Sequence, residues 1–128
     1  MATTAEQPPI DEAHARQLLD RERERIEAAL ADARRLRRGE VEELDREPDM
    51  STGGELIEEK EVDEALERRL RAELEAVERA EKRLEDGTYG FSVQSGEPIP
   101  PPRLETIPWA ERTAEEQERY ERIHGSTL

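Results

Sequence analysis

Two long segments without glycine or proline restrict the folds open to this chain. They cover residues 11–38 and 55–86. Apolar residues recur every seven positions in both: Leu19, Ile26 and Ala33 in the first segment, and Leu70, Val77 and Leu84 in the second. Such a repeat places apolar side chains along one narrow stripe of an α-helix, which is the pattern of helices that pack as a coiled coil. The sequence therefore predicts two long amphipathic helices.

A short segment rich in turn-forming residues separates the two predicted helices. Residues 45–54 read D-R-E-P-D-M-S-T-G-G, and proline and paired glycines interrupt helices. At 1.5 Å per residue, each helix would be about 42–46 Å long. Two apolar stripes of similar length joined by a short loop favour an antiparallel hairpin, predicted over residues 11–86 with its tip loop at about 45–55. Pairing between helices of two chains is the alternative.

The composition favours helices packed along a seam over one large core. Of the 128 residues, 42% are charged and 33% are hydrophobic. The chain has four aromatic residues: Tyr89, Phe91, Trp109 and Tyr120. Low hydrophobicity with high net charge is also the signature of disorder, but the regular spacing of the apolar residues argues against disorder in the middle of the chain.

The net charge of −14 limits the kinds of partner. Binding to nucleic acid depends on clustered lysine and arginine that neutralise phosphates, so the acidic field predicts no direct nucleic-acid binding. A protein with a basic surface or channel is the expected partner. The arginine-rich run at residues 34–38 is interpreted as a charge bias that suits a helix C-terminus. Catalysis is not expected, because no catalytic triad, phosphate-binding loop or dinucleotide-binding motif occurs.

The start of the chain carries no targeting signal. No segment approaches the ~20 apolar residues of a membrane span. The first residues, M-A-T-T-A-E-Q-P-P, lack the hydrophobic core of a signal peptide. We therefore expect a cytoplasmic protein that does not bind membranes, with residues 1–10 as a disordered leader.

The chain changes character after the second helix. Gly87 is placed to end that helix in the left-handed conformation, and the five prolines that follow exclude a long helix. Residues 91–93 and the segment around Ile99 are predicted to pair as a small β-hairpin. Residues 113–116, T-A-E-E, match a helix capping box and predict a last short helix that ends near Ile123.

The lobe predicted over residues 87–128 has the outline of a four-cysteine zinc ribbon. Such a ribbon has two C-x2-C pairs separated by about 15–20 residues. Here the pairs are Ser92-x2-Ser95 and Thr113-x2-Glu116, with 17 residues between them. Zinc requires thiolate, imidazole or carboxylate ligands, so these four degenerate positions predict no metal site and no cofactor. Their hydroxyls are expected to make turn and cap hydrogen bonds.

A lobe without metal needs another source of stability, because structural zinc contributes about 10–16 kcal/mol in small fingers. Prolines lower the entropy of the unfolded chain. Aromatic and aliphatic side chains are expected to pack as a cluster at the base of the hairpin: Tyr89, Phe91 and Trp109, with Ile99, Leu104 and Ile107.

Three short motifs around the lobe point to a known family. They are E-D-G-T-Y-G at 85–90, S-G-E-P-I-P at 95–100 and R-L-E-x-x-P at 103–108. Together they resemble the C-terminal signature of the DksA/TraR-type zinc-finger transcription factors, in a member that lacks the zinc-ligand cysteines. The resemblance implies a mainly α fold: an antiparallel coiled-coil hairpin, a small C-terminal lobe like a degenerate zinc ribbon, and a final short helix.

The resemblance also implies a partner and a site. Proteins of this family bind RNA polymerase and insert their hairpin through its secondary channel, where acidic residues at the tip act near the catalytic centre. The corresponding loop here carries Asp45, Glu47 and Asp49, in D-R-E-P-D instead of the D-x-x-D-x-A of the best-known members. The implied function is regulation of transcription by a monomer. The alternative is a non-catalytic coiled-coil adaptor or structural dimer that has lost the ancestral function.

Overall fold

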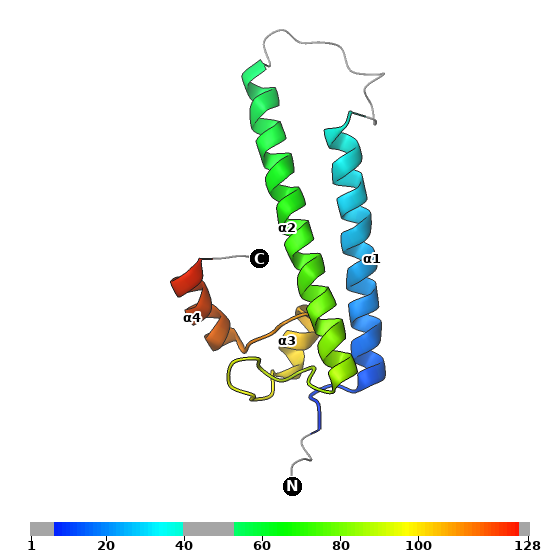
Figure 1. Cartoon of the computed structure of the whole chain (residues 1–128), viewed down its shortest axis with the longest axis vertical. Coiled ribbons are helices and arrows are strands. Elements are labelled where there is room, and N and C mark those ends of the chain that lie inside the picture. The colour runs from blue at the N-terminus through cyan, green and yellow to red at the C-terminus, as the bar shows by residue number, and fades with distance from the viewer. Residues whose placement is uncertain (1–6, 40–52, 126–128) are drawn as a thin grey trace.

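The chain forms a long helical hairpin with a small lobe at one end (Figure 1). The structure, a computed structural model, describes residues 7–39 and 53–125. Its elements are α1 (Glu12–Arg37), α2 (Gly53–Asp86), α3 (Pro101–Thr106) and α4 (Ala114–His124). The two long helices run antiparallel, and the predicted fold class is confirmed.

The apolar stripe of each long helix faces the other helix. The seven-residue repeat places Leu19 and Ile26 of α1 and Val77 of α2 in this seam, where all three are fully buried. The buried seam comprises Ala15, Leu19, Ile26, Leu30 and Ala33 from α1, and Leu70, Val77, Ala80 and Leu84 from α2. Burying one leucine, isoleucine or valine contributes about 1.5–3 kcal/mol, so the seam supplies much of what holds the hairpin together.

The helix bounds differ slightly from the predicted ones. α1 has 26 residues and α2 has 34, which correspond to about 39 and 51 Å at 1.5 Å per residue. α2 begins at Gly53 instead of near Glu55 and so includes two glycines, each of which costs a helix only about 1 kcal/mol. None of the described helices has the length and apolar character of a membrane-spanning segment.

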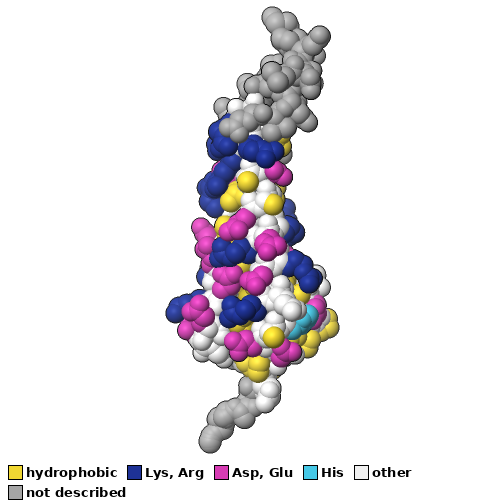
Figure 2. Space-filling model, turned by 90° about the vertical axis from the view of Figure 1, so that its right-hand side faces the viewer, with side chains coloured by type: hydrophobic (Ala, Val, Ile, Leu, Met, Phe, Trp, Pro, Cys, Tyr) yellow, Lys and Arg dark blue, Asp and Glu magenta, His cyan; other side chains and the backbone are white. Residues whose placement is uncertain are grey.

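The arginine run at the end of α1 contacts a buried carboxylate of α2. Glu67 is 5% exposed and pairs with Arg34 (3.4 Å), Arg37 (3.1 Å) and Arg71 (2.6 Å). Burial raises the pKa of Glu67, but these arginines outweigh it and keep that pKa below its ordinary value. The run therefore makes a specific contact between the helices in addition to its helix-end charge. Figure 2 shows acidic and basic side chains interleaved along one face of the rod.

The lobe closes the end of the hairpin at which α1 begins and α2 ends. Ile99 and Leu104 of the lobe are fully buried. With Tyr89 and Ala110 they belong to the same apolar cluster as the hairpin seam. Trp109 packs against this cluster from its edge. The lobe and the hairpin thus share one core.

The segment between the zinc-ribbon pairs differs from its prediction in two ways. It contains α3, of six residues, where no helix was predicted. Pro101 and Pro102 occupy its first turn, where a fixed φ favours the helix and a missing N–H costs nothing. Among the described residues, the predicted β-hairpin is reduced to a bridge between Phe91 and Pro98, because prolines have no N–H to donate to a ladder.

The end of the expected leader packs onto the lobe. Pro9 and Ile10 are half-buried, and Ile10 contacts the core cluster. Gly90 has a φ of +91°, and a Cβ at this position would lie 2.7 Å from Cδ of Pro9. Glycine is therefore required both by the backbone conformation and by the close approach. The predicted leader extends too far, since residues 9 and 10 belong to the folded unit.

Candidate functional site

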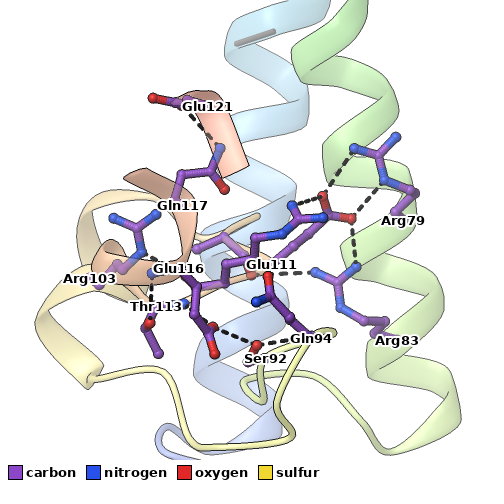
Figure 3. Close-up of polar contacts among 12 residues, drawn as sticks. Arg79, Arg83, Ser92, Gln94, Arg103, Glu111, Thr113, Glu116, Gln117 and Glu121 are labelled. Carbon is purple, nitrogen blue, oxygen red and sulfur yellow. Dashed lines mark hydrogen bonds and ion pairs between the residues drawn. The ribbon is translucent and has the colours of Figure 1, made fainter. Parts of the chain in front are cut away.

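Three of the four positions of the zinc-ribbon outline, Ser92, Thr113 and Glu116, lie together in the lobe (Figure 3). Ser92 Oγ donates to the Glu116 carboxylate at 2.6 Å and accepts the backbone N–H groups of Gln94 and Ser95 at 3.0 and 3.1 Å. Glu116 Oε1 also accepts the Thr113 N–H at 2.9 Å. In return, Thr113 Oγ1 accepts the Glu116 N–H at 3.3 Å. The two pairs, 17 residues apart in the sequence, therefore meet at one carboxylate.

Local structure positions each of these groups. Thr113 is the N-cap of α4 and Glu116 is its third residue, so the predicted capping box is confirmed. Ser92 begins a turn in which its hydroxyl binds backbone N–H groups two and three residues further on, as serine often does. Gly96 closes this turn with a φ of +78° and donates its N–H to the Ser92 carbonyl at 2.9 Å.

The Glu116 carboxylate is buried and ionised. Its residue is 6% exposed. The hydrogen bond from Ser92, with further hydrogen bonds from Ser95 and Thr113, lowers the pKa of Glu116 to about 2, and burial opposes this only in part. A carboxylate with such a pKa stays charged from neutral to mildly acidic pH. The centre of the lobe therefore holds a fixed negative charge.

A second polar cluster fixes the lobe to α2. Glu111 accepts hydrogen bonds from Arg79 at 2.7 Å and from Arg83 at 3.2 Å (Figure 3). Burial raises the pKa of Glu111, but the two guanidinium groups outweigh it and keep that pKa below its ordinary value. This cluster was not predicted from the sequence. The four-residue spacing of the arginines places them on one helix face, but nothing in the sequence indicates that residue 111 returns to that face.

The three aromatic residues expected in the lobe pack in different ways. Tyr89 is 3% exposed and donates its hydroxyl to the Pro108 carbonyl at 2.8 Å. Burial raises the pKa of Tyr89 to about 12. Trp109 is half-buried against the core cluster. Phe91 is half-buried and bridges to Pro98.

Known proteins share the sequence of this lobe. Residues 87–122 match the prokaryotic dksA/traR C4-type zinc finger. The chain is 44% identical over 66 residues to the RNA polymerase-binding transcription factor DksA of Caulobacter vibrioides, a match that covers 48% of this chain and 46% of that protein. It is 39% identical over 80 residues to general stress protein 16O of Bacillus subtilis, covering 61% of this chain and 49% of that protein. The chain thus spans about half the length of these curated relatives.

The likeness in fold extends over most of the chain. The structure of transcription factor DksA2 from Pseudomonas aeruginosa matches with a TM-score of 0.68 and 29% sequence identity, covering 90% of this chain and 86% of that one. This chain resembles the DksA/TraR family both in the sequence of its lobe and in its fold. The resemblance found in the sequence is confirmed, and this chain has no cysteine.

The donor atoms of this lobe do not fit the zinc ion that a C4-type finger implies. Such a site uses four thiolates, whereas three of the four corresponding positions carry hydroxyls, on Ser92, Ser95 and Thr113. Only Glu116 offers a ligand of a suitable kind, and its carboxylate is already hydrogen-bonded to Ser92 and Thr113. Among the side chains that the structure describes, in residues 7–39 and 64–125, no group of three or more histidine, cysteine, aspartate or glutamate residues is placed to hold a metal ion.

The residues expected at the tip of the hairpin are Asp45, Glu47 and Asp49. All three lie outside the described residues. Their role therefore stays a prediction from the sequence.

Proposed function

We propose that this chain binds RNA polymerase and regulates transcription by inserting its hairpin into the secondary channel of the enzyme. The observation that carries the proposal is the likeness of hairpin and lobe together to DksA2, over 90% of this chain with a TM-score of 0.68. The DksA of Caulobacter vibrioides is described as an RNA polymerase-binding transcription factor. The net charge of −14 suits a partner with a basic channel.

The packing of the hairpin supports action as a single rod. Its apolar seam is occupied within one chain, since Leu19, Ile26 and Val77 are fully buried against the opposite helix. In addition to this apolar contact, Glu67 of α2 forms ion pairs with Arg34 and Arg37 near the other end of α1, further from the lobe. A rod closed in this way can enter a channel. The coiled-coil adaptor or dimer remains the alternative function.

The proposed acting residues are Asp45, Glu47 and Asp49. Carboxylates are the protein groups that Mg²⁺ prefers, and a protruding acidic loop can approach a bound metal ion or a basic channel wall. At the other end of the rod, the lobe is held to α2 by Glu111. In this proposal the lobe and the base of the hairpin contact the rim of the channel while the tip acts inside it.

The test is capture of core RNA polymerase by the tagged chain, with another secondary-channel protein as competitor. We expect binding that the competitor displaces. The variant D45N/E47Q/D49N is expected to bind with similar affinity but to change transcription initiation less. Its control, E24Q/D32N/E75Q, also removes three negative charges, but from exposed positions along the middle of the two long helices. Absence of binding at tens of micromolar, or a stable dimer whose contact buries the lobe, would contradict the proposal.

A further inference from the structure

The lobe matches a zinc-finger family, but its side chains do not include the ligands that bind zinc in such a finger. Residues 87–122 match a C4-type zinc finger, yet the chain contains no cysteine. In a four-cysteine site the ion joins two ligand pairs that are distant in the sequence. In this chain those pairs have to be joined by the side chains themselves.

Glu116 makes such a connection. The residue belongs to the first turn of α4, and its Oε1 atom accepts the Thr113 N–H of that same turn at 2.9 Å. The same oxygen accepts the Ser92 hydroxyl at 2.6 Å across a separation of 24 residues. Figure 3 shows the Glu116 side chain directed from α4 toward Ser92.

The contact with Ser92 is more than an incidental addition to a helix cap. A capping box needs only Thr113 and Glu116. A serine hydroxyl has one proton and two lone pairs, and Ser92 uses both lone pairs for the N–H groups of Gln94 and Ser95. Its single proton is therefore directed to Glu116. Both Ser92 and Glu116 are buried, at 5% and 6% exposure, so water competes little for this bond.

We propose that Glu116 takes the place of the metal ion, because its carboxylate links the turn of Ser92 and Ser95 to the start of α4. The lobe then keeps its fold without metal and without thiolates. A chelator then has no structural zinc to remove from the lobe. An oxidant that converts thiolates to sulfenic acids or disulfides has no cysteine to react with in this chain. The DksA/TraR fold is thereby made independent of zinc supply and thiol oxidation.

The experiment uses the full chain and two optical signals. Trp109 is the only tryptophan and packs against the core from the lobe, so its fluorescence reports the lobe, while far-ultraviolet circular dichroism reports the long helices. We expect neither chelator nor added zinc to change the native unfolding curve. Glu116→Ala and Ser92→Ala are each expected to speed proteolysis of the lobe about tenfold or more, since they remove a charge-assisted hydrogen bond. Glu118→Ala, at an exposed position of α4, is the control and should leave the rate unchanged.

A four-cysteine variant, S92C/S95C/T113C/E116C, provides an independent measurement. It is expected to show the native Trp109 signal only with zinc, since the carboxylate link is gone and thiolates now surround the same point. The proposal is wrong if this variant resists proteolysis equally well without zinc, or if zinc does not restore its lobe. Loss of native structure on chelation, or native resistance of Glu116→Ala, also overturns it. None of these measurements involves polymerase, so they are independent of the proposed function.

Discussion

Glu116→Gln is expected to destabilise the lobe at neutral pH and to have little effect near pH 2. Hydrogen bonds from Ser92 and its neighbours lower the pKa of Glu116 from 4.5 to about 2. Each pKa unit corresponds to about 1.36 kcal/mol, so after a discount for solvent screening in a small lobe the ionised carboxylate contributes about 2 kcal/mol. Because the folded pKa lies below the unfolded one, this contribution is fully present above pH 4.5 and is lost as the pH falls to about 2.

Urea unfolding followed by Trp109 fluorescence measures this difference at a series of pH values. Glu118→Gln removes one charge from an exposed position of the same helix and serves as the reference. At pH 7 the Glu116→Gln variant should unfold with a free energy about 2 kcal/mol lower than the reference. The gap should narrow as the pH falls below 4.5 and close near pH 2. A gap that is absent at pH 7, or that stays constant with pH, would refute the assignment of the stabilisation to the ionised carboxylate.

Three further substitutions test other contacts of the lobe. Gly90→Ala should lower the thermal midpoint more than Gly96→Ala does, because both positions have positive φ but only a Cβ at residue 90 meets a proline ring, at 2.7 Å. Glu111→Gln leaves two arginines of α2 without their carboxylate and should cost about 1–3 kcal/mol. The salt dependence of the Trp109 unfolding midpoint should weaken in that variant, since the ion pairs are gone. Tyr89→Phe removes the hydrogen bond to the Pro108 carbonyl and should cost about 1–2 kcal/mol in urea unfolding, because a buried acceptor loses its donor.

The hairpin could be predicted from the sequence because its signal is local and repeated. Leu19 and Ile26 recur at the period of a helix seam, and both are fully buried. The capping box of α4 could be predicted for the same reason, since its two residues lie within one turn. In both cases the residues that identify the element also make its contacts.

The contacts that hold the lobe could not be predicted, because they join segments that are distant in the sequence. The spacing of Ser92 and Glu116 suggested that they meet, but not that a carboxylate would link them at 2.6 Å. The return of Glu111 to Arg79 depends on the path of the chain through α3, and a run of prolines gave no indication of a helix there. Composition alone does not encode such a path.

A single carboxylate can replace a structural zinc ion in this chain only because the lobe does not stand alone. Zinc contributes about 10–16 kcal/mol to a small isolated finger, far more than the carboxylate of Glu116. The lobe, however, buries Tyr89, Ile99 and Leu104 in the same cluster as the hairpin seam, and each such side chain contributes about 1.5–3 kcal/mol. Together with the carboxylate, this burial approaches the lower end of what zinc provides. Packing against the long helices therefore supplies most of the stabilisation that a metal ion would otherwise give the lobe. Glu116 adds the specific link between the turn of Ser92 and the start of α4. On this reasoning the loss of Glu116 loosens the lobe and leaves the hairpin folded, whereas polar substitution of Leu104 should release the whole lobe from the rod.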